Sequence, residues 1–317
     1  MKYATAVSIQ QDNDTTFHIY LSHPEENQSY RSEVIHWKYR HIERIGCLST
    51  THIPYIDALK CNQYLVATGF SECRHYPEIN SSIQNHNITH LTQGEVMDRE
   101  LLIKSAPELF FTYPFGGNTC QDMLDAGIGC VQVTEYLEEH PLGRAEWIKL
   151  FGVLLNRYAM ADSIFNGIER RYKETIAVSQ QNTPLVFFGT FDGEAFYAPP
   201  GNSFIAQLIR DAGAKYYFED SKGSSNIRLD KEQMIEIAAK ANYMGTIEFG
   251  RNEWSQNILA LSKENNPILF RCDASYKDYY GKAILEPDVL LRDFIHIFHR
   301  NGISGDSLKY FEFCRPR

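Results

Sequence analysis

Residues 141–184 read PLGRAEWIKLFGVLLNRYAMADSIFNGIERRYKETIAVSQQNTP, a stretch with no proline between its two ends. Apolar residues recur every three or four positions along it, which is the period of one helix face. These residues are Trp147, Phe151, Leu154, Tyr158, Ala161, Phe165, Ile168, Tyr172 and Ile176. We therefore predict a single helix over residues 143–178, which at 1.5 Å per residue would be roughly 50 Å long. A helix of that length exceeds the usual diameter of a compact domain and predicts a rigid rod.

Strand and helix patterns alternate on both sides of this rod, and that alternation favours mainly parallel sheets. Before the rod, we predict strands at residues 42–47, 64–68, 109–113 and 130–134, and helices at 55–61 and 99–105. After it, we predict strands at 185–188, 243–247 and 268–272, and helices at 203–212, 231–241 and 287–298. The expected fold is α/β, with two lobes joined by one long helix and a ligand cleft between the lobes.

The predicted domain boundaries follow from this pattern. Residues 1–41 form an N-terminal extension with a hairpin, because Phe17, Ile19 and Leu21 alternate before a turn-rich segment. Residues 42–142 form the first α/β lobe, residues 143–180 the connecting helix, and residues 181–317 the second α/β lobe.

The composition is that of a globular chain, with 43% hydrophobic and 22% charged residues over 317 positions, enough for two cores. The net charge is -9 and no run of Lys and Arg occurs, which argues against a nucleic-acid partner. No stretch of about 18 apolar residues is present, and the first ten residues lack a signal-peptide pattern. Read literally, this predicts a cytosolic protein. The alternative is that an export signal has been removed and Met1 added in its place.

The sequence contains seven cysteines, an odd number with no short metal-binding spacing. They are Cys47, Cys61, Cys73, Cys120, Cys130, Cys272 and Cys314. We expect most of them to be reduced, buried and to act as small hydrophobic residues.

Candidate ligand-binding residues follow the predicted strands, because ligands of open parallel sheets bind beyond the carboxyl ends of the strands. In the first lobe these residues are Ser49, Thr50, Thr51, His52, Glu72, Arg74, His75, Tyr113 and Phe115. In the second lobe they are Phe196, Tyr197, Arg251, Trp254 and Tyr276, with Phe249, Tyr279 and Tyr280 beside them. Any one loop aromatic can simply cap a core. Six loops with the same mixture of aromatic and polar groups favour a binding cleft.

Two other classes of protein remain as alternatives. Two lobes of this kind also build transferases and dehydrogenases, but the sequence has no G-x-G-x-x-G that opens a helix and no G-x-S-x-G. A P-loop spacing before Arg251 lacks the required Lys and Ser/Thr, and the pairs His86/His90 and His296/His299 complete no zinc set. A purely structural interaction module would have its loop aromatics buried in the cores.

Four segments carry a family resemblance: GFSECRHYPEI (69–79), APELFFTY (106–113), EYLEEHPLGRAEWIK (135–149) and EPDVLLRDFIHIFH (286–299). In this order they resemble the helical-backbone class of ABC-transporter substrate-binding proteins, the receptors for iron-siderophore complexes, haem and vitamin B12. The resemblance runs from about Ile42 to the C-terminus. It implies two Rossmann-like lobes, a ligand held between them, little hinge motion, no enzymatic activity and no required cofactor.

The resemblance also implies a location and a partner. Such receptors work outside the inner membrane as monomers, commonly on a lipid anchor, and deliver their ligand to the permease of an ABC importer. Glu78 matches the acid with which the first lobe docks on the permease. In the second lobe Arg210 occupies the usual position of the acid, so Asp211 beside it is the candidate there.

The nature of the ligand is argued from side-chain chemistry. An aromatic cleft suits large planar or ring-bearing molecules. Arg74 and Arg251 suit an anionic iron chelate, and Tyr113, His52 and His75 are candidate iron ligands. We therefore expect a ferric siderophore or haem first and a corrinoid such as cobalamin second, with Trp254 as the nearest fluorescent reporter.

Overall fold

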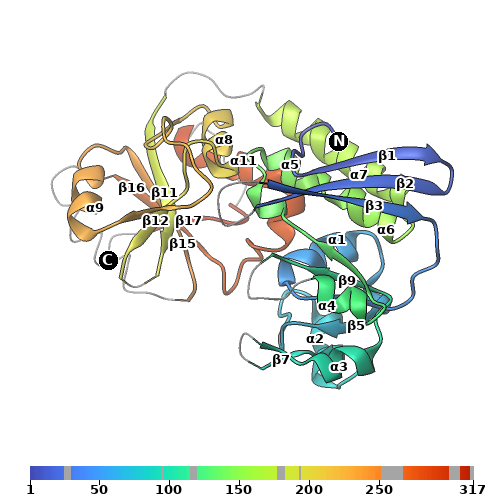
Figure 1. The fold of residues 1–317 in the computed structure, drawn as a ribbon. Helices are drawn as coiled ribbons and strands as arrows, with labels where there is room; N and C mark the ends of the chain where they lie inside the picture. The colour runs from blue at the N-terminus through green and yellow to red at the C-terminus, as the bar shows by residue number, and fades with distance from the viewer. Residues whose placement is uncertain are drawn as a thin grey trace. The chain divides into compact units, whose positions relative to one another are not determined.

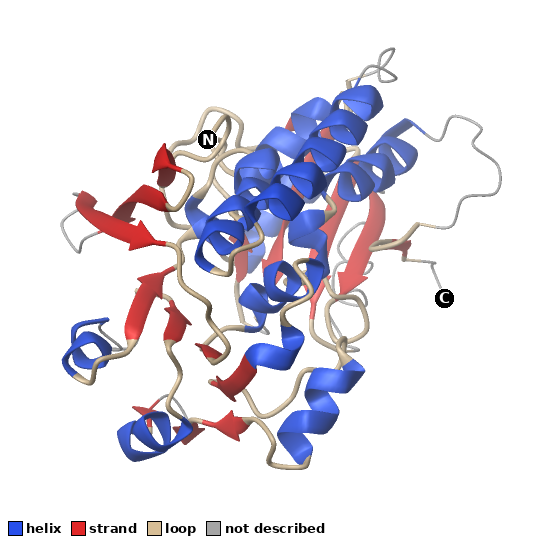
Figure 2. Cartoon of the chain, turned by 90° about the vertical axis from the view of Figure 1, so that its right-hand side faces the viewer, coloured by secondary structure: helices blue, strands red, loops and turns tan. Residues whose placement is uncertain are grey.

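The computed structural model describes residues 1–24, 30–93, 96–114, 120–176, 183–192, 194–250, 267–299 and 308–314. The chain forms two compact units. The first comprises Met1–Glu138 and Gly143–Asn166, and the second comprises Glu139–Leu142 and Gly167–Arg317. Helices and strands are present in both units (Figures 1 and 2), and each unit is described by itself. Residues 1–41, predicted as an extension, belong to the first unit.

The main sheet of the first unit is parallel. Among the described residues its strand order is β10-β9-β4-β5-β6, and every neighbouring pair runs in the same direction. The bounds are β4 Ile45–Cys47, β5 Leu65–Thr68, β6 Thr89–His90, β9 Leu109–Thr112 and β10 Gly129–Gln132. The four strands predicted in this lobe are therefore confirmed within a few residues.

Short helices alternate with these strands. They are α1 Ile53–Ala58, α2 Pro77–Gln84, α3 Arg99–Ser105 and α4 Cys120–Asp125, with 3-10 turns η1 Thr50–His52, η2 Asn62–Tyr64 and η3 Glu135–Leu137. A small hairpin pairs β7 Thr92–Gln93 with β8 Val96–Met97. Leu48, Leu102, Phe110 and Met123 pack in the core, and a disulfide joins Cys120 of α4 to Cys130 of β10. The remaining cysteines are free and four of those five are buried, so the expectation for most cysteines is confirmed.

The N-terminal residues form a three-stranded antiparallel sheet, β1 Val7–Asn13, β2 Thr16–Pro24 and β3 Tyr30–Lys38 (blue in Figure 1). Phe17, Ile19 and Leu21 are buried on one face of β2, as their alternation predicts. The predicted hairpin corresponds to β2 and β3, and its turn lies outside the described residues. The prediction omitted β1, which adds a third strand.

Two buried carboxylates hold the residues before β1. Glu146 accepts hydrogen bonds from the backbone N–H groups of Lys2, Tyr3 and Ala4 at 2.7–3.0 Å. Glu138 accepts from the N–H groups of Thr5 and Ala6 and from the indole of Trp147. Hydrogen bonds to a charged acceptor are strong, so these contacts hold the N-terminal segment firmly to the first unit.

The predicted single helix over residues 143–178 is wrong at its N-terminal half. The structure has three helices instead, α5 Pro141–Glu146, α6 Ile148–Leu154 and α7 Tyr158–Ile176. The last helix has 19 residues and is about 28 Å long. It begins in the first unit and ends in the second. The predicted last two residues, 177 and 178, lie outside the described part of the chain.

A Schellman motif ends α6. Asn156 is in the left-handed conformation, with φ of 59°, and its N–H donates to Val153 O at 3.3 Å. The N–H of Arg157 donates to Gly152 O at 2.6 Å, which closes the motif. A Cβ at Gly152 would lie 2.5 Å from the Cβ of Ala161, so glycine permits the close approach of α7. The apolar period continues through this break, which is why periodicity alone predicts one helix.

The second unit has a mixed sheet of order β14-β12-β11-β15-β16-β17, with β13 also paired to β11. The strands β11, β13, β15 and β16 are parallel, whereas β12, β14 and β17 are antiparallel to their neighbours. Their bounds are β11 Leu185–Phe191, β12 Phe196–Ala198, β13 Lys215–Tyr216, β14 Ile227–Leu229, β15 Tyr243–Glu248, β16 Ile268–Asp273 and β17 Glu312–Phe313. The predicted parallel strands are confirmed, and the antiparallel ones were not foreseen.

The helices of the second unit agree with their predicted ranges within three residues. They are α8 Phe204–Asp211, α9 Lys231–Ala238 and α11 Pro287–His299, with a 3-10 turn η4 Lys282–Leu285. Ser203 caps α8, and Asp230 with Gln233 forms a capping box at α9. Phe187, Leu229, Met244 and Leu269 belong to the core.

Candidate functional site

The carboxyl ends of β9, β4 and β5 bring several predicted residues to one edge of the parallel sheet in the first unit. Ser49 follows β4, and its Oγ accepts from the N–H of Thr51 at 3.2 Å, which starts η1. Gly69 follows β5 and donates to Cys47 O, and a Cβ there would lie 2.7 Å from Leu48 O. The glycine therefore lets the two loops lie side by side. Thr50 is exposed, while Ser49, Thr51 and Tyr113 are half-buried.

The loop after β5 presents charged groups to solvent. Arg74 donates from Nε to Glu72 Oε2 at 2.6 Å, and both side chains are more than half exposed. An exposed pair of this kind contributes little stability, so the guanidinium can exchange Glu72 for another anion at low cost. His75 is exposed in the same loop.

His52 does not lie on this surface, and its prediction as an accessible iron ligand is wrong. The side chain is 1% exposed and its ring contacts Phe111 and Phe151 in the core. Burial lowers its pKa to about 3, so the imidazole is neutral at physiological pH. The 3-10 turn directs Thr50 outward and His52 inward, an orientation that spacing after a strand does not specify.

A buried acid at the same edge was missed. Glu135 follows β10 in η3, is buried, and accepts a hydrogen bond from the side chain of Thr51. Burial raises its pKa, and the opposing charge of Arg144 lowers it. The sequence could have identified Glu135, because it lies in the loop after the fourth predicted strand, and residues after parallel strands are candidates for ligand binding. Glu135 links that loop to η1 and holds Thr51 in place.

In the second unit, exposed aromatic side chains follow β15 and β16. Phe249 and Tyr280 stack with ring centroids 5.6 Å apart and an interplanar angle of 3°. Phe249 is 59% exposed, Tyr280 39% and Tyr276 77%. Asp273 fixes the two loops, because its Oδ1 accepts from the N–H groups of Gly250 and Ser275 at 3.1 and 3.0 Å. We name Phe249, Tyr276 and Tyr280 the aromatic platform.

Phe196 does not belong to this surface, and its prediction as a cleft residue is wrong. It is 1% exposed in β12 and packs on Phe187 with ring centroids 5.0 Å apart. The strand β12 starts opposite Phe191, the last residue of β11, and the alternation of side chains along β12 turns Phe196 into the core. Tyr197 points to the other side of β12, is half-buried, and hydrogen-bonds the carboxylate of Asp192. The predicted residues Phe115, Arg251 and Trp254 lie outside the described part of the chain.

The two predicted docking acids differ in their surroundings. Glu78 is exposed in the first turn of α2. Asp211, at the end of α8, accepts from the hydroxyl of Tyr172 at 2.6 Å and from the amide of Gln207 at 2.7 Å. Its two oxygens therefore already serve contacts within the second unit.

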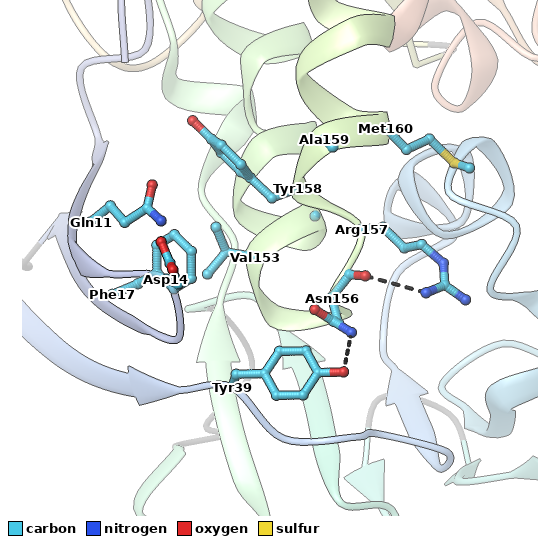
Figure 3. Close-up of a pocket in the computed structure, with 11 residues that line it drawn as sticks. Gln11, Asp14, Phe17, Tyr39, Val153, Asn156, Arg157, Tyr158, Ala159 and Met160 are labelled. Carbon is cyan, nitrogen blue, oxygen red and sulfur yellow. Dashed lines mark hydrogen bonds between the residues drawn. The ribbon is translucent and has the colours of Figure 1, made fainter.

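A pocket of about 440 Å³ lies in the first unit, between the N-terminal sheet and the α6–α7 junction (Figure 3). Phe17, Val153 and Tyr158 supply apolar walls, and the amide of Asn156 hydrogen-bonds the hydroxyl of Tyr39 at 2.6 Å. None of the predicted ligand-binding residues that the structure describes lines it.

Two kinds of feature are absent from the described residues. No helix there combines the length and apolarity needed to cross a bilayer. No group of three or more His, Cys, Asp or Glu side chains there is arranged to hold a metal ion.

Both units are α/β, and in each of them loops that follow parallel strands carry exposed polar or aromatic side chains. The family model described as periplasmic binding protein matches residues 80–246, slightly more than half of the chain. The chain belongs to the periplasmic binding protein family, which confirms the resemblance and the predicted α/β fold class.

Known relatives and structures agree with this assignment. An uncharacterised lipoprotein of Methanocaldococcus jannaschii is 24% identical over 291 residues, which cover 85% of this chain and 68% of that protein. A periplasmic haem-binding protein of Pseudomonas aeruginosa matches with a TM-score of 0.64 and 13% identity over 87% of this chain and 99% of that chain. A siderophore-binding protein of Vibrio cholerae with bound Fe³⁺–Desferal matches with a TM-score of 0.62 and 12% identity over 81% of this chain and 99% of that chain. At these identities the two structures show a common fold.

Proposed function

We propose that this protein captures an iron chelate, a ferric siderophore or haem, outside the inner membrane and delivers it to an ABC importer. Membership of the periplasmic binding protein family supports a receptor that binds and releases its ligand unchanged. Two proteins of similar fold are a haem-binding protein and a siderophore-binding protein, and both of those ligands carry iron.

The aromatic platform is the observation that carries this proposal. Its three aromatic side chains are substantially exposed, and two of them stack in parallel. Exposed apolar surface of this kind marks a binding site. Flat, ring-bearing ligands bury such surface favourably. The platform follows two parallel strands, the place at which ligands of such sheets bind.

The first unit has polar groups of its own that suit an anionic iron chelate. The ion pair between Arg74 and Glu72 is exposed, so a carboxylate or catecholate of the ligand can replace Glu72 beside Arg74. Ser49, Thr50 and Thr51 offer hydroxyl groups, and Tyr113 and His75 are the remaining candidate iron ligands of the described residues.

The disulfide between Cys120 and Cys130 supports the proposed location, because disulfides persist mainly in oxidising compartments. A relative named as a lipoprotein supports a lipid anchor. We propose Glu78 as the contact with the permease, since its carboxylate is exposed. Asp211 is the weaker candidate because its oxygens accept hydrogen bonds from Tyr172 and Gln207.

A ligand panel tests this function. The purified protein is titrated with haem, a ferric catecholate and cyanocobalamin while its intrinsic fluorescence is recorded. We expect saturable quenching by an iron chelate. The dissociation constant should rise about tenfold in Phe249→Ala and in Tyr280→Ala, since each aromatic contact contributes up to about 1.5 kcal/mol. Tyr20→Ala, at an exposed aromatic of the N-terminal sheet, is the matched control and should bind as the parent does.

The outcomes separate the alternatives. Binding of cyanocobalamin alone would move the ligand to the corrinoid class within the same family. Binding of none of the three ligands, or binding that is indifferent to the aromatic platform, would refute the proposal.

A further inference from the structure

Two histidines face each other on the outer side of the N-terminal sheet. His18 of β2 and His36 of β3 are directly opposite in the antiparallel register. Their Nδ1 atoms are 2.8 Å apart, and the ring centroids lie 4.8 Å apart with the planes at 88°. The pair is exposed, because Phe17, Ile19, Leu21 and Trp37 occupy the buried face of these strands.

We propose that His18 and His36 form a bidentate site for a divalent transition metal ion, separate from the ligand-binding loops. Neutral imidazole nitrogen is among the commonest metal ligands in proteins. Two such nitrogens, each about 2.0–2.1 Å from one ion and at right angles to each other, would be roughly 2.9 Å apart. The same bonds at a tetrahedral angle would place them about 3.3 Å apart. The observed Nδ1–Nδ1 distance of 2.8 Å is that of a hydrogen bond between the rings, and it is also close to the spacing of adjacent corners of a square-planar or octahedral ion.

That geometry selects the class of metal. Square-planar or tetragonal sites made of nitrogen and oxygen ligands are typical of Cu²⁺ and Ni²⁺, whereas Zn²⁺ prefers a tetrahedron. Gln10 of β1 is paired with His18 in the register and brings a side-chain carbonyl to the same face of the sheet. Water would complete the coordination, which leaves an open and exchangeable site.

The backbone fixes the positions of the two rings. Residues from Thr16 to Pro24 pair continuously with residues from Lys38 to Tyr30, and the inner face is packed. A metal site on paired strands is better defined than one on a loop. Without an ion, the two Nδ1 atoms lie at hydrogen-bond distance from each other, with the donor set by the tautomer. Because the χ2 torsion of histidine is broad, both rings can turn their Nδ1 lone pairs toward a shared ion.

Titration of the full chain with Ni²⁺ tests the site. The protein is produced without a polyhistidine tag, and binding is measured by calorimetry for the parent, His18→Gln, His36→Gln and the control His41→Gln. His41 is exposed in the same unit but is paired with Glu43 rather than with a histidine. We expect one ion to bind the parent and the control, and binding to be lost in each of the other two variants.

A second measurement addresses geometry. With Cu²⁺, the paramagnetic resonance spectrum of the parent should be tetragonal and show coupling to imidazole nitrogen, which either variant should lose. Failure of the parent to bind Ni²⁺, equal binding by all four proteins, or a Cu²⁺ spectrum without imidazole coupling would each overturn the proposal. Because the variants change only exposed side chains, equal unfolding temperatures provide the check that each has folded.

Discussion

His52 gives the stability of the first unit a dependence on pH. Its pKa in the folded protein is about 3, below the ordinary value of 6.5, because burial disfavours the charged ring. Below pH 6.5 the unfolded chain therefore binds a proton that the folded chain does not. The free energy of unfolding should fall as the pH decreases from 6.5 toward 3, by about 1.4 kcal/mol per pH unit from this residue.

The variant His52→Phe removes this titration and keeps an aromatic ring beside Phe111 and Phe151. Urea unfolding between pH 4 and 7 should show a shallower loss of stability for the variant than for the parent. The control His41→Gln, at an exposed histidine, should follow the parent. Parallel curves for parent and His52→Phe would contradict a neutral, buried His52.

At the scale of single residues, the sequence predicts position along a strand better than the direction of a side chain. Thr50, Arg74 and Tyr276 follow their strands and are exposed. His52 and Phe196 occupy equally plausible positions in the sequence but point into cores, because a 3-10 turn and an antiparallel strand set their directions. Short sequence spacing between histidines does not reveal the pair His18 and His36, because strand register brings together residues 18 positions apart.

At the scale of elements, Asn156 determines where α6 ends. The left-handed conformation raises the free energy of a residue with a Cβ by about 1–2 kcal/mol, and glycine and asparagine adopt it most readily. We expect Asn156→Ala to lower the free energy of unfolding by about 1 kcal/mol relative to Asn156→Gly. Both variants lose the hydrogen bond to Tyr39, so their difference isolates the backbone contribution. Chemical denaturation measures it, and equal stability of the two variants would contradict the Schellman ending.

The disulfide between α4 and β10 supports a second prediction at this scale. It closes a loop of ten residues, which in the chain-entropy description stabilises the folded state by about 3 kcal/mol. The double variant Cys120→Ala, Cys130→Ala should be less stable by about that amount in denaturant. A reducing agent should destabilise the parent and leave the double variant unchanged. A parent that is insensitive to reduction would show that the bond does not contribute.

Most elements were predictable because strands and helices here obey simple patterns. The helix α3 has its predicted bounds, and α11 differs by one residue, since Pro287 begins the helix and the apolar face repeats regularly. The short antiparallel strands β12, β14 and β17 have two or three residues each, too few to show a period. The break before α7 was not predicted, because the apolar stripe continues through residues at which the helix is interrupted.

At the scale of the whole molecule, the proposed receptor has two separable tasks, binding a ligand and docking on a permease. Glu78 is suited to the second task, because it is exposed at the start of α2 and lies outside the aromatic platform. Exposed charges contribute little to affinity but steer association and set its register. A change of charge at Glu78 should therefore act on transfer of the ligand and not on its capture.

We expect Glu78→Lys to reduce uptake of a labelled iron chelate by cells that carry the matching importer, while the affinity of the purified receptor for that chelate stays unchanged. Reversal of the charge replaces attraction to basic groups of the permease by repulsion, and high salt should narrow the difference between variant and parent. Glu100→Lys is the matched control, because Glu100 is also an exposed acid in the first turn of a helix, α3. Normal uptake by Glu78→Lys would refute the docking role, whereas a parallel loss of chelate affinity would place Glu78 in the ligand site instead.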